Sequence, residues 1–361
     1  MSTTGATIKE IDTETLRRWL DAHRPVTVVD VRSDDARAQW AIPGSLHVNA
    51  YDALRVGAPG PLADVDLPAD RPVVTVCNAG RMSVTAAAIL AGRGFDAHSL
   101  SGGMKAWSLA WNTATVPIAD PSATVIQVRR TGKGCLSYVI GSDGEAAVID
   151  PSVAADVYTT IAREHGWSIR FVIETHVHAD HLSRSRELTR QTGARLLLPA
   201  QDRVTFPFTP VSDGEQVSVG RATLTALHTP GHTLESTSFL LNGTALFTGD
   251  TLFTDGVGRP DLHADTRTAC ARAAALATSL VRLRRLRDDV LVLPAHTSEP
   301  VAFDGTPVLS PLCDIEPWLS QWLVSEPAFV QRVTSQLPPT PPSFSRILAL
   351  NEAGGNRCAV R

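Results

Sequence analysis

The chain has 361 residues, of which 43% are hydrophobic, enough for a buried core but somewhat long for a single domain. The formal charge is nearly balanced, with 33 Lys and Arg against 37 Asp and Glu and a net charge of -4. This balance gives no sign of a nucleic-acid footprint or an acidic tail, so two globular domains without a nucleic-acid partner are expected.

The beginning of the chain, MSTTGATIKEIDTETL, lacks the apolar segment of a signal peptide. No apolar run approaches the ~20 residues that span a bilayer, so we expect a cytoplasmic protein without a membrane partner. The five cysteines are odd in number and contain no CxxC pair, which argues against a disulfide framework or a zinc–thiolate site.

The first ~110 residues alternate short β-branched runs with helical patterns, as in an α/β unit with a parallel sheet. VTVVDV (26–31) and VVTVC (73–77) are the clearest buried strands. The sequence then becomes polar and contains proline, which predicts a linker over residues 113–123. We therefore expect one domain over residues 1–112 and a second over residues 124–361.

The second domain is richer in strands than in helices. Strand-like runs are TVIQV, SYVI, AAVID, RFVIET, ARLLL, TLTAL, STSFLL, TALFTG and VLVLPA, and helical patterns fall near 153–165, 184–192 and 265–287. Several runs alternate in hydrophobicity, as expected of packed sheets with helices outside. The tail, about residues 337–361, has a proline-rich break and then a short amphipathic helix, which predicts a surface strap.

Cys77 is the first candidate for chemistry. It ends the strand VVTVC and begins the loop CNAGRMS, after which VTAAAILAGRGF has a helical pattern. Backbone N–H groups of such a loop point inward at a helix N-terminus, and their positive partial charge favours a thiolate. Cys77 is therefore either a nucleophile or anion-binding thiol, or a small buried cysteine.

Two flanking segments favour the first interpretation. DVRSDDARAQWAIPGSLHV (30–48) and LSGGMKAW (100–107), together with the cysteine loop, resemble the rhodanese (sulfurtransferase) family over about residues 8–112. The resemblance implies an α/β domain with a parallel sheet and flanking helices. It also implies that Cys77 carries a persulfide.

The rhodanese resemblance has one departure. Met82 stands where the family has an arginine, and Arg81, one position earlier, is the expected substrate-binding cation. Ser83 stands where the related phosphatases need an arginine, so phosphate-ester chemistry is not expected.

The stretch THVHADH (175–181) follows the apolar run FVI and supplies His176, His178, Asp180 and His181. It lies at the C-terminal end of a predicted strand, where ligands of α/β sheets collect. On an extended backbone the first two histidines point to one side, and the last two residues turn back toward it. A bound metal is the economical explanation.

Three more candidates follow other strands: His232 in HTPGHT, Asp250 in FTGD and His296 in LPAH. Each is weak alone, since a histidine at a strand end is commonly structural. In this order they resemble the HxHxDH, H, D, H pattern of the metallo-β-lactamase superfamily. That resemblance implies an αβ/βα sandwich over about residues 124–300.

Within that superfamily the sequence most resembles the persulfide dioxygenases, through ETHVHADHLS, HTPGHTLES and FTGDTLFTDGVGRPDL. The resemblance implies that one Fe(II) is held by His176, His232 and Asp250. The remaining candidates would orient these ligands, bind water or hold a second metal: His178, Asp180, His181 and His296. The implied substrates are O2 and a low-molecular-weight thiol persulfide such as glutathione persulfide, with thiosulfate or sulfite exchanging sulfur at Cys77.

Arg259, in GVGRPD, matches the family's glutathione-recognising arginine, and a structural ion pair with Asp261 is the competing interpretation. The residues after His296 depart from the usual continuation, so the identity of the thiol stays open. A dinuclear zinc thioester hydrolase of the hydroxyacylglutathione type is the alternative function. A third interpretation makes the first domain a binding or sulfur-carrier module, and a homo-oligomer also stays open.

Overall fold

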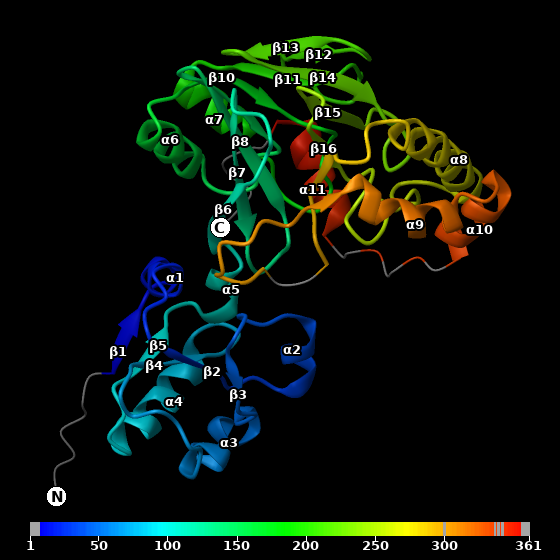
Figure 1. Ribbon diagram of the computed structural model, residues 1–361. Helices are drawn as coiled ribbons and strands as arrows, with labels where there is room; N and C mark the ends of the chain where they lie inside the picture. The colour runs from blue at the N-terminus through cyan, green and yellow to red at the C-terminus, as the bar shows by residue number, and fades with distance from the viewer. Residues whose placement is uncertain (1–7, 299–300, 336, 338–339, 341–342, 355–361) are drawn as a thin grey trace, which may run out of the picture. The chain divides into compact units, whose positions relative to one another are not determined.

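The computed structural model describes residues 8–298, 301–335, 337, 340 and 343–354, and the chain forms two compact units (Figure 1). The first unit comprises residues up to Thr113, joined by Arg129–Gly134 and Ser298–Thr306. The second comprises Ala114–Val128, Cys135–Thr297 and the described residues from Pro307 onward.

The first unit is built on a five-stranded parallel sheet in the order β1-β5-β4-β2-β3. Its strands are β1 (Lys9–Ile11), β2 (Thr27–Asp30), β3 (Leu46–His47), β4 (Val73–Val76) and β5 (Ala97–Leu100). Its helices are α1 (Thr13–Asp21), α2 (Asp34–Gln39), α3 (Tyr51–Arg55), α4 (Arg81–Gly92) and α5 (Gly103–Trp107).

Both faces of this sheet are covered. Because neighbouring residues of a strand point to opposite faces, Val28 packs in one core cluster with α1 and α5, and Val29 packs in another with α3 and α4. This is the α/β architecture with a parallel sheet that the rhodanese resemblance predicts, and the prediction is confirmed.

The DVR sequence has a structural role in the first unit. Asp30 and Arg32 are both buried, and the Arg32 Nη2 atom donates to Asp30 Oδ2 over 2.7 Å. A buried ion pair that lost one partner would leave an uncompensated charge, so this pair holds the end of β2 in a defined conformation.

Two mixed sheets make up the second unit, apart from residues 111–113 of β6 and 129–130 of β7, which belong to the first unit. The seven-stranded sheet has the order β12-β11-β10-β9-β8-β7-β6, and the six-stranded sheet has the order β13-β14-β15-β16-β17-β18. The strands of the first are β6 (Trp111–Val116), β7 (Thr124–Arg130), β8 (Leu136–Ser142), β9 (Glu145–Ile149), β10 (Ser168–Ile173), β11 (Arg195–Pro199) and β12 (Thr209–Val211). Those of the second are β13 (Gln216–Val219), β14 (Ala222–His228), β15 (Thr237–Leu241), β16 (Ala245–Gly249), β17 (Leu291–Pro294) and β18 (Ser310–Pro311).

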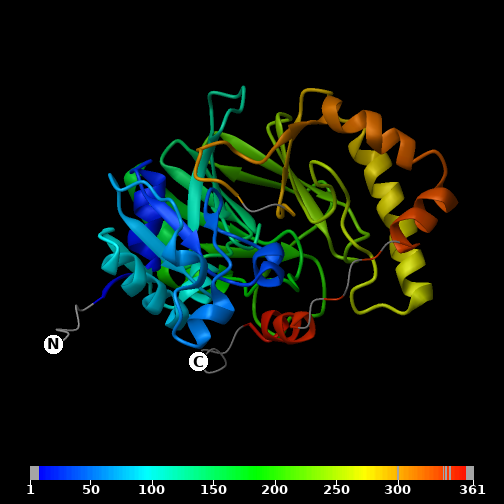
Figure 2. The same ribbon diagram turned by 90° about the horizontal axis from the view of Figure 1, so that it is seen from below.

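Helices lie outside both sheets, as the views in Figures 1 and 2 show. Helices α6 (Ala155–Glu164) and α7 (Ser185–Thr192) pack against the seven-stranded sheet. Helices α8 (Thr266–Leu283), α9 (Leu312–Trp322) and α10 (Glu326–Ser335) share a core cluster with β16 and β17 of the other sheet. This is the predicted αβ/βα sandwich, and it is also confirmed.

The sequence and the structure differ at the boundary between the domains. Residues 111–116, where the linker was expected to begin, form β6, whose burial alternates along the strand. Strands β12, β13 and β18 and helices α9 and α10 were not predicted. The predicted helix of the C-terminal strap is present as α11 (Phe344–Glu352).

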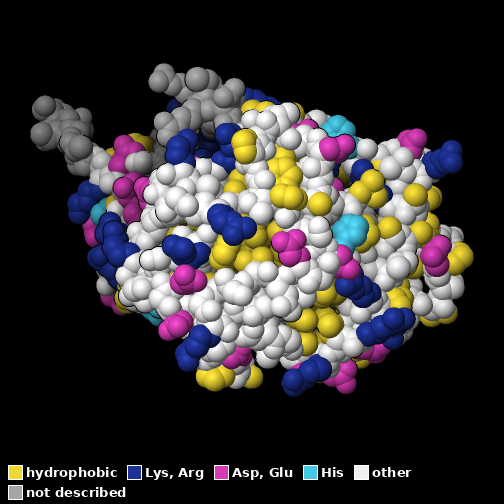
Figure 3. Space-filling view, turned by 90° about the horizontal axis from the view of Figure 1, so that it is seen from above, with side chains coloured by type: hydrophobic (Ala, Val, Ile, Leu, Met, Phe, Trp, Pro, Cys, Tyr) yellow, Lys and Arg dark blue, Asp and Glu magenta, His cyan; other side chains and the backbone are white. Residues whose placement is uncertain are grey.

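Two further findings concern membrane-spanning helices and the distribution of surface charge. No helix within the described residues is long and apolar enough to cross a bilayer. Figure 3 shows one face of the molecule, on which basic and acidic side chains are interspersed instead of gathering into a patch of one sign.

Candidate metal centre and sulfurtransfer loop

The seven metal-ligand candidates meet at one edge of the second unit. The ligand loop, residues 174–184, connects β10 to α7 and carries four of them, and the other three follow β14, β16 and β17. Within the described residues, three groups of side chains could each hold a cation. We name them by one member: the His176 group, the Cys135 group and the His178 group.

The His176 group consists of His176, His232 and Asp250. Asp250 Oδ2 lies 3.9 Å from His176 Nε2 and 3.7 Å from His232 Nε2. These spacings are too long for hydrogen bonds, and the donor atoms of the group all lie within 4.8 Å of one another. The three donors therefore surround a point that a cation could occupy.

Neighbouring groups fix both imidazoles of the His176 group. Thr175 Oγ1 donates to Asp150 Oδ2 over 2.8 Å, so it accepts from His176 Nδ1 at 3.0 Å. His232 Nδ1 donates to the Arg259 carbonyl over 2.9 Å. Both Nε2 atoms are thus left as lone-pair donors that face Asp250.

The His176 group fits a metal ion by two further observations. His176 Nε2 is buried without a hydrogen-bond partner among the described residues, which is costly unless an ion satisfies it. Burial, and next the neighbouring His178, hold the pKa of His176 well below its usual value, so the imidazole is neutral and able to ligate. Two neutral imidazoles and one carboxylate are a donor set that suits Fe(II) with open positions.

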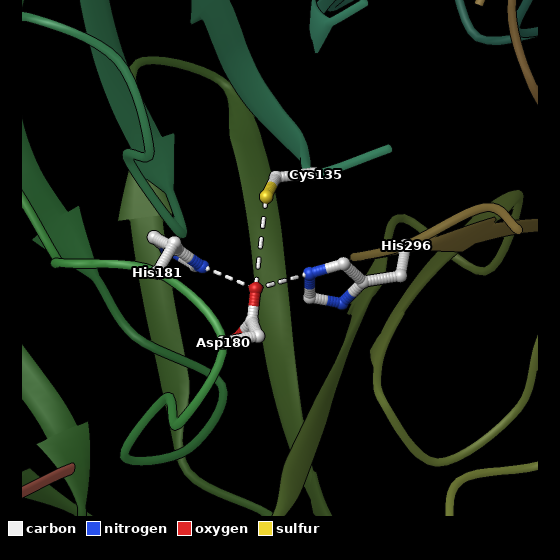
Figure 4. Close-up of side chains that lie close together, drawn as sticks. All are labelled: Cys135, Asp180, His181 and His296. Carbon is white, nitrogen blue, oxygen red and sulfur yellow. Dashed lines mark hydrogen bonds and ion pairs between the residues drawn. The ribbon is translucent and has the colours of Figure 1, made fainter. Parts of the chain in front are cut away.

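The Cys135 group consists of Cys135, Asp180, His181 and His296 (Figure 4). Three donors converge on Asp180 Oδ2: His296 Nε2 at 2.6 Å, His181 Nδ1 at 2.9 Å and Cys135 Sγ at 3.6 Å. His296 Nδ1 donates to Asp250 Oδ1 over 2.7 Å and so joins this group to the His176 group. The arrangement offers sulfur, oxygen and nitrogen donors, which suit zinc.

The electrostatics of the Cys135 group follow from these contacts. Burial opposes charge on His296, but Asp180 and Asp250 outweigh it and hold the pKa of His296 well above its usual value. Burial alone would raise the pKa of Cys135. Hydrogen bonds from His181 and His296 together have the larger effect, and they lower the pKa to about 6. Cys135 can therefore donate to Asp180 as a thiol, and it loses its proton readily enough to bind a cation as a thiolate.

Cys135 was not recognised as a candidate from the sequence. It precedes β8 and reaches the site because its backbone pairs with that of His296 in an isolated bridge. No local spacing signals this contact, since 45 residues separate Cys135 from Asp180.

The His178 group consists of Asp150, Glu174 and His178, all buried. His178 Nε2 donates toward Asp150 Oδ1 at 3.1 Å and Glu174 Oε2 at 3.0 Å. Burial disfavours charge here, but the two carboxylates outweigh it and hold the pKa of His178 well above its usual value. The ring centroids of His176 and His178 are 4.2 Å apart, so the two rings are neighbours as expected, but they belong to different groups.

Arg259 and Gly258 border the His176 group. A Cβ atom on Gly258 would lie 1.8 Å from the Asp250 carbonyl oxygen, so only glycine allows this approach. Arg259 donates to both carboxylate oxygens of Asp261, at 2.8 and 2.7 Å. The structure therefore contains the Arg259–Asp261 ion pair, which was the alternative to a substrate-binding role for Arg259.

A hollow opens beside this border. It is lined by Val257, Gly258, Arg259, Trp322, Arg332, Val333 and Leu337. Arg332 is exposed, and its guanidinium lies 5.0 Å from the centre of the Trp322 ring. Two cations and an aromatic wall thus stand next to the residues that position His232 and Asp250.

The loop of Cys77 lies at the end of β4 in the first unit. The thiol is buried, and Gly80 N–H donates to Cys77 Sγ over 3.2 Å. Helix α5 closes the loop from the other side: Met104 N–H donates to the Cys77 carbonyl over 2.8 Å, and a Cβ on Gly103 would lie 2.1 Å from that oxygen. Arg81 is exposed at the start of α4.

Comparisons with known proteins agree with this division of the chain. A profile described as "Rhodanese-like domain" matches residues 12–110, and one described as "Metallo-beta-lactamase superfamily" matches residues 130–296. A hydroxyacylglutathione hydrolase of Rhodospirillum rubrum is 35% identical over 162 residues, which are 42% of this chain and 57% of the relative. One from Rhodopseudomonas palustris is 32% identical over 179 residues, 48% of this chain and 67% of the relative.

Two solved structures of this superfamily's fold also resemble the chain. A metallo-beta-lactamase from Staphylococcus aureus superposes with a TM-score of 0.60 at 28% identity, covering 65% of this chain and 74% of that one. ETHE1 from Myxococcus xanthus superposes with a TM-score of 0.55 at 28% identity, covering 64% of this chain and 98% of that one. The chain therefore belongs to the metallo-beta-lactamase superfamily, with a rhodanese-like domain preceding the superfamily domain.

Proposed function

We propose that this chain is an iron-dependent persulfide dioxygenase with a sulfurtransferase domain. The reaction converts a thiol persulfide, O2 and water to the thiol, sulfite and two protons (RSSH + O2 + H2O → RSH + SO3²⁻ + 2 H⁺). The observation that carries the proposal is the convergence of His176, His232 and Asp250 as a two-histidine, one-carboxylate group. Such a face leaves positions open for substrates.

The protein's own groups prepare the site for an anionic persulfide. Fe(II), when bound, would supply the redox chemistry with O2. Thr175 and the Arg259 carbonyl hold the two imidazoles with Nε2 toward the centre. Neutral imidazoles and one carboxylate leave a divalent cation with a net positive charge, which attracts a persulfide anion.

The hollow beside Gly258 favours an anionic thiol, such as glutathione, as the molecule that carries the persulfide. Its side chains Arg259, Arg332 and Trp322 offer positive charge and an aromatic wall. Because Arg259 is bound to Asp261, the exposed Arg332 is the cation better placed to meet a substrate carboxylate.

Replacing Arg332 with alanine should raise the KM for glutathione persulfide roughly 3- to 10-fold and leave kcat unchanged, since an exposed cation contributes modestly to binding. Steady-state oxygen uptake measures both constants. Arg285→Ala, at an exposed arginine near the end of α8, is the matched control and should change neither. An unchanged KM in Arg332→Ala would remove this residue from substrate recognition.

The rhodanese-like domain would exchange sulfane sulfur at Cys77. The thiolate attacks the outer sulfur of thiosulfate, the S–S bond breaks, and sulfite leaves as Cys77 becomes a persulfide. A low-molecular-weight thiol then takes the outer sulfur and becomes the persulfide substrate of the second domain. The same steps in reverse would return sulfur from a thiol persulfide to sulfite.

A dinuclear zinc thioester hydrolase is the second candidate function. It is favoured by the Cys135 group, which lies beside the His176 group through His296, and by the curated relatives named hydroxyacylglutathione hydrolase. In that case both groups would hold zinc and generate a hydroxide nucleophile.

One experiment separates the two functions. Protein purified anaerobically is loaded with iron or with zinc, then given glutathione persulfide or S-lactoylglutathione. We expect the iron form to consume O2 and release sulfite in equal amounts, with little thioester cleavage by either form. Thioester cleavage without O2 uptake would overturn the dioxygenase proposal in favour of the hydrolase.

A further inference from the structure

Helix α11, near the C-terminal end of the chain, contacts the ligand loop through Asn351. This side chain is 9% exposed. Its Nδ2 atom donates to the carbonyls of His178 and His181, both over 2.8 Å. Its Oδ1 atom accepts from the N–H of Ser183 at 3.0 Å. One amide group from the strap therefore satisfies three backbone groups of the loop.

These contacts matter because the ligand loop has no regular secondary structure between β10 and α7. Buried backbone groups outside helices and sheets need other partners, and a missing partner costs free energy or forces the loop to move. The two N–H groups of the amide serve His178 and His181, whose side chains belong to two different groups of the centre. Asn351 thus fixes the backbone on both sides of Asp180.

The next residue of α11 reaches the other end of the loop. Arg203 donates to Glu352 Oε1 from Nε and Nη2, at 3.1 and 2.9 Å, and to Glu235 Oε1 from Nη1 at 2.8 Å. Glu235 Oε1 also accepts from the N–H of Val177 at 3.4 Å, between His176 and His178. Glu352 is therefore linked, through two charged side chains, to the segment that carries His232.

We propose that α11 is a positioning element of the metal centre and that Asn351 is its principal positioning residue, setting the backbone from which His178, Asp180 and His181 project. The inference rests on the proposed metal centre but not on the reaction it performs. A helix that merely covered apolar surface would need only Leu348, which is also buried. Packing against apolar surface alone would not require the three polar contacts of Asn351.

The test uses full-length Asn351→Ala and Asn351→Asp variants. Aspartate keeps the size of the side chain and its acceptor, but it cannot donate to the two carbonyls and would repel them. Ser345→Ala, at an exposed position of the same helix, is the matched control. The measurements are the dissociation constants of Co(II) and Zn(II) by chelator competition, the visible absorption spectrum of the Co(II) form, and thermal unfolding of the metal-free protein.

We expect both Asn351 variants to bind Co(II) roughly 10- to 100-fold more weakly than the wild type, as with other groups that orient ligands. The Co(II) spectrum should change as well. In oxygen uptake, kcat should fall with the KM for persulfide unchanged, because the hollow that contains Arg332 is not altered. Ser345→Ala should behave like the wild type in every measurement.

Unchanged metal affinity and spectrum in both variants, even with a lower unfolding temperature, would overturn the inference, because Asn351 would then serve the fold alone. Failure of both variants to fold would overturn it for the same reason. A wild type that binds metal but consumes no O2 would refute the proposed function and leave the effect of Asn351 on metal affinity measurable.

Discussion

Replacing Asp250 with alanine should remove the metal from the His176 group and lower persulfide-dependent oxygen uptake roughly 1000-fold or more, corresponding to about 4 kcal/mol or more of lost transition-state stabilisation. Asp250 is the one carboxylate of the group, and its Oδ2 atom faces both His176 Nε2 and His232 Nε2. Its other oxygen accepts from His296, so the change would also leave that imidazole with one partner fewer. Metal content by elemental analysis and initial rates of oxygen uptake measure the two effects.

Asp255→Ala is the matched control, since Asp255 is exposed and lies five residues further along the chain. It should retain both metal and activity. Sulfurtransfer from thiosulfate, measured on the same Asp250→Ala preparation, should be unchanged, which would show that the first unit is folded. Oxygen uptake at the wild-type rate in Asp250→Ala would refute the assignment of the His176 group as the catalytic centre.

Some of the predicted strands are buried on both faces and therefore have a continuous apolar run. Residues 73–76, 146–149 and 196–198 are buried at every position in β4, β9 and β11. The last four residues of β6, 113–116, were predicted as the start of a linker because the strand, WNTATV, contains three polar residues, although its buried Asn112, Ala114 and Val116 keep a period of two. The polar side of a half-buried strand resembles a loop when only composition is considered.

The candidate site was predictable in its residue types, and the family resemblance already singled out His176, His232 and Asp250, but the spacing of the residues alone did not divide them into groups. HxHxDH and the later His, Asp and His could be recognised because they follow strands whose ends meet at one edge. Which of them share a group depends on Asp150 and Glu174, which bind His178, and on Cys135, which joins Asp180. The contacts of Asp150 and Cys135 span 28 and 45 residues, distances over which no spacing rule applies.

Helix α11 of the C-terminal strap shows more clearly which contacts a sequence pattern cannot predict. An amphipathic helix near the C-terminal end was predicted from hydrophobic periodicity, which says that one side packs against something. It does not say that Asn351 would meet backbone groups about 170 residues earlier, because a side-chain amide that bonds to carbonyls leaves no pattern in the sequence it contacts. The helix was therefore predictable, and its role in the centre was not.

Replacing Cys77 with serine should abolish sulfur transfer from thiosulfate, because a serine oxygen cannot form a persulfide, while oxygen uptake with preformed glutathione persulfide should be unchanged. The thiol is positioned by the Gly80 N–H and by the contacts of its own carbonyl with α5, none of which depends on the metal centre. Cys313→Ser is the matched control, since Cys313 is a free and exposed cysteine, and it should transfer sulfur normally.

The informative measurement combines the two activities of the Cys77→Ser variant. Oxygen uptake started with thiosulfate and glutathione requires that Cys77 first generate the thiol persulfide, so this rate should fall to background while uptake from the preformed persulfide continues. Asp250→Ala should show the opposite pattern, with sulfur transfer retained and both oxygen-uptake rates lost. If thiosulfate still supported oxygen uptake in Cys77→Ser, the sulfur would be reaching the metal centre by another route, and the rhodanese-like domain would be left with a binding role.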